Sequence, residues 1–165
     1  CEDFVRDKDA VSACAILAEI AAWAKDQGIT MYQLLQNIYV QYGFSKEKGI
    51  SVVKKGKSGA EEIEAMMKHF RENPLQEIAG SKVTLFYDYA SLKGKDYVEN
   101  ETLTLDMPTT SNVLQYFTED GTKVSIRPSG TEPKIKFYCE VHSKVKSLDE
   151  LPAAKKSRSR KRSKR

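Results

Sequence analysis

One polar loop carries an unusual concentration of groups suited to binding a single anion. Its sequence is Arg127-Pro-Ser-Gly-Thr-Glu-Pro-Lys134. The guanidinium of Arg127 is a planar donor that matches two phosphate oxygens, and Lys134 adds a second positive charge. The hydroxyls of Ser129 and Thr131 flank Gly130, whose missing side chain lets backbone N–H groups approach an anion. Two prolines restrict the backbone, so little conformational entropy is lost on binding. These residue types predict a preformed phosphate-binding loop.

The same loop also suits an ordinary connection between two strands, because Ser, Gly, Thr and Pro are common in turns and exposed basic residues are often merely solvated. The flanking segments, residues 123–127 and 134–141, alternate polar and apolar residues as strands do. The pair Asp120-Gly121 predicts a tight hairpin turn before the first of them. The candidate loop is therefore expected at a hairpin tip, with Arg127 on the polar face of its strand.

The longer string from Arg127 to Tyr138 resembles the C-terminal phosphate-binding signature of the α-D-phosphohexomutases, the phosphoglucomutase and phosphomannomutase family. Other segments fall in the order seen in the fourth domain of that family: Lys54–Ile63, Asn73-Pro74, Ala79-Gly80 and Ser111–Leu114. Upstream, Arg6-Asp-Lys-Asp-Ala10 and the apolar segment after it are similar to the end of the third domain. The resemblance covers roughly residues 4–142.

The resemblance implies a magnesium-dependent enzyme that moves a phosphoryl group between the C1 and C6 hydroxyls of a hexose. It implies a phosphoserine, a hexose 1,6-bisphosphate intermediate, and glucose phosphate or mannose phosphate as the substrate. The residues that it assigns to the non-reacting phosphate are Arg127, Ser129, Gly130 and Thr131. Arg6 and Lys134 are further candidates for phosphate binding, and Lys8 is the candidate catalytic residue near the reacting phosphate.

An alternative explanation exists for the segment that contains Arg6 and Lys8. Acidic residues in the first turn of a helix complement its dipole, and neighbouring basic residues pair with them. The family's phosphoserine, metal and sugar loops would precede Cys1, and no segment here has the closely spaced aspartates that a short Mg²⁺-binding loop needs. We therefore expect no metal ligand in this chain, and we expect the chain alone to bind phosphate weakly and to be inactive.

Composition restricts the remaining function classes. Three cysteines stand singly and only two histidines occur, which argues against a disulfide framework or a zinc site and indicates a reducing, cytoplasmic location. No apolar stretch approaches the length of a membrane span and no signal-peptide pattern is present. We expect no membrane partner.

The net charge of +4 arises from the last eleven residues, 155–165, which carry eight of the 27 basic side chains. Without them, 19 basic residues face 23 acidic ones. Such a run predicts a disordered basic tail. It also supports a rival function, in which an inactive fragment or non-catalytic domain binds polyanions or nucleic acid non-specifically through this tail. No other nucleic-acid binding is expected, and the tail has no interleaved aromatic residues for base stacking.

The N-terminal part predicts two helices. Residues 7–27 are apolar on nearly every face, with Asp7 or Asp9 as the N-terminal cap and Gly28 at the end. A second helix, about 31–42, begins with a capping box of Thr30 and Gln33. Residues 1–43 are expected to be the incomplete end of the third domain, with apolar faces exposed in the isolated chain. Residues 44–49 are expected to be a hinge.

Residues 50–154 are expected to form the phosphate-binding fourth domain, of the α+β class. A short strand near 50–54 and a helix over 58–72, capped by Ser58 and Glu61, should precede several alternating strands. In the first of these, Val83, Leu85, Tyr87 and Tyr89 share one parity. The pattern predicts an antiparallel sheet of about four or five strands backed by the 58–72 helix.

Overall fold

The computed structural model describes residues 9–54 and 56–160, and Arg6 and Lys8 lie outside this part of the chain. The chain divides into two compact units. One contains the chain up to Phe44 together with Lys144–Ala154, and the other contains Ser45–Ser143 and the segment from Lys155 onward. None of the helices in the described ranges has the length and apolar character needed to cross a membrane.

The first unit begins with two helices whose ends follow the predicted capping residues. Helix α1 spans Ala10–Asp26, and the Asp9 carboxylate accepts hydrogen bonds from the backbone N–H groups of Val11 and Ser12. Hydrogen bonds to Ser12 lower the pKa of the Asp9 carboxyl. Helix α2 spans Met31–Tyr42, and its capping box of Thr30 and Gln33 is formed as predicted.

Most apolar residues of α1 are not buried within this unit. Ala24 is the helix's buried residue, whereas Trp23 and Leu17 are more than half exposed. The unit's core is instead a small cluster of Phe44, Val145 and Leu151, with Tyr39 and Ala154 packed against it. The expectation that this helix would expose apolar surface is therefore confirmed.

The C-terminal segment differs from its prediction. After the 3₁₀ turn η1 (Leu148–Glu150), helix α4 runs from Leu151 to Arg160, so residues 155–160 are helical where a disordered tail was expected. Leu151 is buried and begins the helix, and Ala, Lys and Arg have high helix propensity, so the helix extends into the basic segment. Residues 161–165 lie outside the described part.

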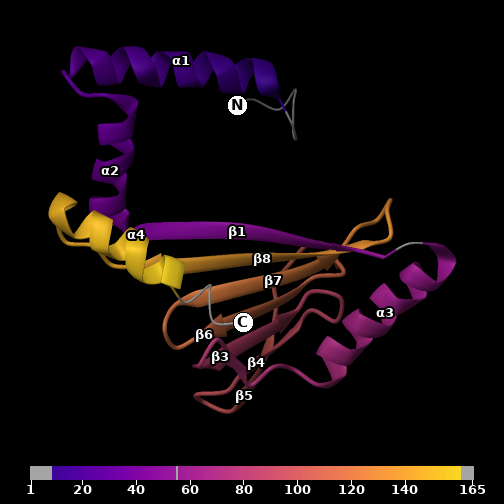
Figure 1. Cartoon of the computed structure of the whole chain (residues 1–165). Coiled ribbons are helices and arrows are strands. Elements are labelled where there is room, and N and C mark those ends of the chain that lie inside the picture. Colours follow the sequence, from indigo (N-terminus) through magenta and orange to yellow (C-terminus); the bar gives the residue numbers. More distant parts are fainter. Residues whose placement is uncertain (1–8, 55, 161–165) are drawn as a thin grey trace. The chain divides into compact units, whose positions relative to one another are not determined.

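The second unit is built on an eight-stranded antiparallel sheet, larger than the four or five strands predicted (Figure 1). The strand order is β1-β8-β7-β6-β3-β4-β5, and β2 pairs with β3 beside this path. The strands span Phe44–Val53 (β1), Glu77–Ile78 (β2), Ser81–Asp88 (β3), Lys93–Asp96 (β4), Glu101–Thr104 (β5), Leu114–Thr118 (β6), Thr122–Pro128 (β7) and Lys134–Ser143 (β8). The extra strands are short or lack a clear apolar alternation, as in Lys93-Gly-Lys-Asp96 of β4.

Strand β1 covers the segment that the sequence assigned to a hinge and a short strand. It is ten residues long and begins at Phe44. The boundary between the two units lies at the start of this strand, between Phe44 and Ser45. A hinge function for residues 44–49 stays a prediction.

Helix α3 packs on one face of the sheet and closes the main core. It spans Gly56–Glu72, so it starts two residues before the predicted cap Ser58, which lies inside its first turn. Its buried residues Ile63 and Met67 pack against sheet residues that include Leu114, Tyr116, Ile126 and Ile135. The fully buried Tyr116 donates its hydroxyl to the Phe70 carbonyl near the end of α3, at 2.9 Å.

The predicted orientation of the β3 side chains is wrong after Val83, because the strand contains a register shift. Val83 is buried, as alternation predicts, but the next buried apolar residue is Phe86 rather than Leu85. The pairing between β3 and β6 shifts between Val83 and Leu85. Because such a bulge moves the following residues to the other face, Tyr87 lies on the side away from α3. There its ring makes edge contacts with Tyr89 and Phe117.

Candidate functional site

The predicted phosphate-binding loop lies at the tip of the hairpin between β7 and β8. The two strands pair antiparallel up to Pro128 and Ile135. Beyond this pair, the Ser129 N–H donates to the Lys134 carbonyl at 2.8 Å, and the Lys134 N–H donates to the Glu132 carbonyl at 2.7 Å. The hairpin-tip prediction is confirmed, and the loop is fixed to the sheet at its base. A loop carried on rigid strands is well placed for binding.

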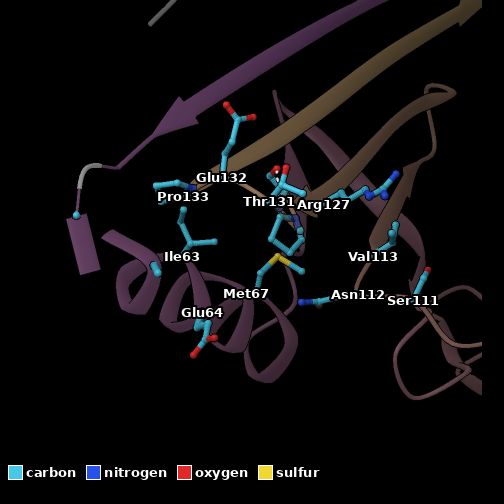
Figure 2. Close-up of a pocket in the computed structure, with 15 residues that line it drawn as sticks. Ile63, Glu64, Met67, Ser111, Asn112, Val113, Arg127, Thr131, Glu132 and Pro133 are labelled. Atoms are coloured by element: carbon cyan, nitrogen blue, oxygen red, sulfur yellow. Dashed lines mark hydrogen bonds between the residues drawn. The ribbon is translucent and has the colours of Figure 1, made fainter. Parts of the chain in front are cut away.

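Arg127 stands at the end of β7 with its guanidinium available. Its neighbours Val124 and Ile126 are buried, whereas Arg127 itself is exposed, as strand parity predicts. No described residue forms an ion pair or a side-chain hydrogen bond with it. Figure 2 shows its guanidinium extending on the side of the pocket where Val113 lies. The planar donor is therefore free to meet a ligand.

The polar groups after Arg127 also face open space. Ser129 is half-buried, and its hydroxyl lies 3.5 Å from the N–H of Thr131. A Cβ atom at Gly130 would meet nothing within 4 Å, so packing does not require glycine at this position. This open space leaves room for a ligand to approach the Gly130 backbone.

This loop forms one wall of a cavity of about 650 Å³ (Figure 2). Two other segments, distant in sequence, complete it: residues 56–67 of α3 and the turn at residues 111–113. The lining residues are Gly56, Ala60, Ile63, Glu64, Met67, Ser111, Asn112, Val113, Arg127, Pro128, Ser129, Gly130, Thr131, Glu132 and Pro133. A pocket of this size, with an apolar floor and a few polar groups at its rim, suits a small ligand.

The loop contains an internal ion pair between Lys134 and Glu132. The hydrogen bond from Lys134 lowers the pKa of the Glu132 carboxyl. Lys134 was predicted as a further phosphate-binding residue, and in this structure its ammonium is paired with Glu132, so a role in phosphate binding stays a prediction. Glu64 adds a second exposed carboxylate to the cavity. The positive charge that remains unpaired at the rim belongs to Arg127.

The start of α3 is fixed to the loop through Lys54. The Lys54 N–H donates to the Pro133 carbonyl at 2.9 Å, and the Lys54 ammonium lies 2.7 Å from the Glu62 carboxylate. Gly59 is buried against the Lys54 backbone, and a Cβ atom there would lie 2.7 Å from the Lys54 carbonyl carbon. The absence of a side chain at Gly59 thus lets the helix approach the segment that supports the loop.

Asn112 is a lining residue that sequence reasoning did not assign to the site. Its amide oxygen accepts a hydrogen bond from Arg71 at 2.9 Å, and Arg71 is paired at 3.0 Å with the buried carboxylate of Asp88. The string Ser111–Leu114 did contribute to the family resemblance. Its position beside the candidate loop comes from sheet order, which a local pattern does not reveal.

The described residues offer no fit for a metal ion. They contain no group of three or more His, Cys, Asp or Glu side chains able to hold one. Cys14 is an exposed free thiol.

Comparison with known proteins bears directly on this site. Residues 50–154, which contain the loop and the whole cavity, match the model of the family described as phosphoglucomutase/phosphomannomutase, C-terminal domain. The chain belongs to this family. The resemblance seen in the sequence is thereby confirmed, and within it the chain is a C-terminal-domain segment.

Individual relatives extend the match beyond that domain. A phosphoglucomutase of Staphylococcus haemolyticus is 36% identical over 141 residues, which is 86% of this chain and 25% of the relative. A phosphoglucomutase of Staphylococcus aureus is 39% identical over 137 residues, covering 83% of this chain and 24% of the relative. The chain thus spans about a quarter of the length of these relatives.

Among solved structures, the open form of the exocytosis-sensitive phosphoprotein pp63/parafusin, a phosphoglucomutase from Paramecium, matches 88% of this chain and 24% of its own. Its sequence identity is 18% and the TM-score is 0.48.

Proposed function

We propose that this chain is the C-terminal part of a phosphoglucomutase or phosphomannomutase, and that its β7–β8 loop holds the non-reacting phosphate of the substrate. The substrate class is a phosphorylated hexose, glucose phosphate or mannose phosphate. The whole enzyme would interconvert the 1-phosphate and the 6-phosphate through a phosphoserine and a hexose 1,6-bisphosphate. This chain would contribute the binding and orientation of one phosphate.

The observation that carries the proposal is the unpaired guanidinium of Arg127 at the rim of a cavity lined by the rest of the loop. Arginine matches two phosphate oxygens at once. The hydroxyls of Ser129 and Thr131 and the N–H of Gly130 supply further donors from the same loop. Because β7 and β8 fix the base of the loop, little order must be created when the phosphate binds.

The other steps of the enzyme's reaction would depend on residues outside this cavity. Lys8, the candidate catalytic residue, and Arg6 remain proposals, since both lie outside the described part of the chain. Mg²⁺ is implied for the family's reaction, but the described residues do not fit it, and no step of this chain is assigned to the metal. Residues 44–49 are proposed as the hinge that closes this domain over substrate and excludes water.

The proposal is tested by titrating the chain with glucose 6-phosphate and following backbone amide shifts by NMR. Replacing Arg127 with alanine should raise the dissociation constant by about 10- to 150-fold, which corresponds to ~1.5–3 kcal/mol for hydrogen bonds to a charged group. The fold should be unaffected, because Arg127 is exposed and makes no contact that the fold requires.

Lys93→Ala is the matched control. Lys93 is an exposed basic residue on β4, which is separated from β7 by two strands in the sheet, so the variant removes one positive charge away from the cavity. Its affinity should stay within about twofold of the wild type, since exposed charges at that separation are largely screened. An Arg127→Ala affinity equally close to the wild type would remove the assignment.

A further inference from the structure

The turn that carries Asn112 is held rigidly beside the proposed phosphate site. The Ser111 N–H donates to the Tyr89 carbonyl at 3.1 Å, and the Tyr89 N–H donates to the Val113 carbonyl at 3.0 Å. A third bond, from the Val113 N–H to the Ser111 carbonyl at 2.8 Å, closes the turn. Asn112 is therefore at the apex of a three-residue turn fixed on both sides.

The orientation of the Asn112 amide follows from its partner. The Arg71 guanidinium is only a donor, so the group that faces it must be the amide oxygen and the NH₂ must point elsewhere. No described residue accepts a hydrogen bond from that NH₂. Figure 2 shows the side chain reaching toward Met67 across the cavity. Two amide protons are thus presented to the cavity without a protein acceptor.

Arg71 is itself fixed by a buried acid. Its Nε atom lies 3.0 Å from Asp88, whose side chain is only 7% exposed. The Asp88 carboxylate also accepts hydrogen bonds from the Ala90 N–H at 3.1 Å and from the Ser91 hydroxyl at 2.8 Å. The chain of contacts from Asp88 through Arg71 to Asn112 pre-orients the amide before any ligand arrives.

We propose that Asn112 donates a hydrogen bond to a ring hydroxyl of the bound hexose phosphate, and that Arg71 is the positioning residue that aims it. The inference rests on the proposed function, because it needs the phosphate of the same ligand to be held by Arg127. The β7–β8 loop then binds the phosphate, and the turn at residues 111–113 recognises the sugar. An amide NH₂ is neutral and directional, which suits a hydroxyl oxygen better than a dianion.

The test measures two ligands against each variant in the full chain: glucose 6-phosphate and inorganic phosphate. The quantity compared is the ratio of their affinities, because a change that acts only on the phosphate cancels in this ratio. Asn112→Ala should lower the preference for glucose 6-phosphate by about three- to tenfold, the range for a single neutral hydrogen bond. Arg127→Ala should weaken both ligands and leave the ratio within about twofold.

Asn112→Asp separates ligand contact from a structural role. An aspartate still accepts a hydrogen bond from Arg71, but it has no amide protons to donate. The same loss of preference is therefore expected in Asn112→Asp as in Asn112→Ala. In Arg71→Lys, which keeps a positive charge near Asp88 but cannot bridge to Asn112, a smaller loss is expected. Asn73→Ala, an exposed asparagine outside the cavity, should leave the ratio unchanged.

The side-chain NH₂ resonances of Asn112, identified by their absence in Asn112→Asp, give a direct reading. They should shift with glucose 6-phosphate and stay in place with inorganic phosphate. The inference is overturned if Asn112→Ala keeps the wild-type ratio, or if Asn112→Asp keeps it while Asn112→Ala does not. If Arg127→Ala still weakens both ligands in that case, the proposed function survives. A wild-type chain that binds neither ligand removes both.

Discussion

Replacing Gly59 with alanine tests whether the packing of α3 supports the proposed phosphate-binding loop. The new Cβ atom would lie 2.7 Å from the carbonyl carbon, 2.8 Å from Cβ and 2.9 Å from the carbonyl oxygen of Lys54. Two of these three atoms belong to the backbone, which cannot rotate away as a flexible side chain does. The Lys54 N–H is also bonded to the Pro133 carbonyl of the loop. The helix or the loop must therefore move.

The size of the effect follows from two opposing contributions. Overpacking a well-filled site costs ~1–3 kcal/mol. Alanine is better than glycine inside a helix by ~0.5–1 kcal/mol, which offsets part of that cost. We expect a net loss of ~1–2 kcal/mol in the free energy of unfolding. For a domain the size of residues 45–143, each kcal/mol lowers the melting temperature by about 4–8 °C.

Thermal unfolding followed by circular dichroism measures this loss, and NMR locates it. The amide resonances of Lys54 and Lys134 should shift in Gly59→Ala, and glucose 6-phosphate should bind more weakly. Gly49→Ala is the control, because a Cβ atom at Gly49 meets nothing within 4 Å and should change stability by less than ~1 kcal/mol. If Gly59→Ala were as stable as the wild type and the amide resonances of Lys54 and Lys134 were unchanged, the inference that Gly59 supports the loop would be refuted.

Two further predictions concern Tyr116 and Glu132. Burial raises the pKa of Tyr116 from 10.0 to about 12, so its contribution to stability is complete below pH 10 and is lost as the pH rises toward about 12. Urea unfolding between pH 9 and pH 12 should show this decline in the free energy of unfolding in the wild type but not in Tyr116→Phe. At neutral pH, Tyr116→Phe should be less stable by ~1–2 kcal/mol, because the Phe70 carbonyl loses its hydrogen-bond donor. Equal declines in the two chains would contradict the raised pKa of Tyr116. Glu132→Gln removes a carboxylate from the cavity and releases Lys134, so inorganic phosphate should bind about two- to fivefold more tightly near neutral pH. Weaker binding in that variant would show that Glu132 supports the loop rather than opposing the anion.

Structural features that depend on neighbouring residues were predicted correctly from the sequence. The Thr30–Gln33 capping box, the Asp9 cap and the turn at Asp120-Gly121 each depend on residues within a few positions of one another. Gly121 adopts φ 77°, a conformation that glycine reaches without strain. The exposure of Arg127 beside buried Ile126 likewise follows from strand parity.

The errors arose where contacts distant in sequence override the local pattern. The bulge in β3 places Phe86 rather than Leu85 in the core, and no feature of residues 81–88 marks it. Strand β4 forms because it pairs with β3 and β5, although its own residues have low strand propensity. Helix α4 continues through Arg160 although the charge run predicted disorder.

The same division applies to the candidate site. The candidate phosphate-binding loop and its place at a hairpin tip were predicted from eight consecutive residues and the strands beside them. The opposite wall of the cavity could not be predicted in this way, because Ile63, Met67 and Asn112 lie near the loop only through the packing of α3 and the order of the strands. The Lys134–Glu132 pair also changes the balance of charge that composition alone suggested.

The most direct test of the central claim is an NMR titration of the full chain with glucose 1,6-bisphosphate, observing the backbone amides of Ser129, Gly130 and Thr131. Binding of a phosphate in this loop predicts saturable shifts at these three amides, and predicts that the shifts are abolished in Arg127→Ala and retained in Lys93→Ala. A folded chain in which the three amides stay in place at millimolar ligand would contradict the account.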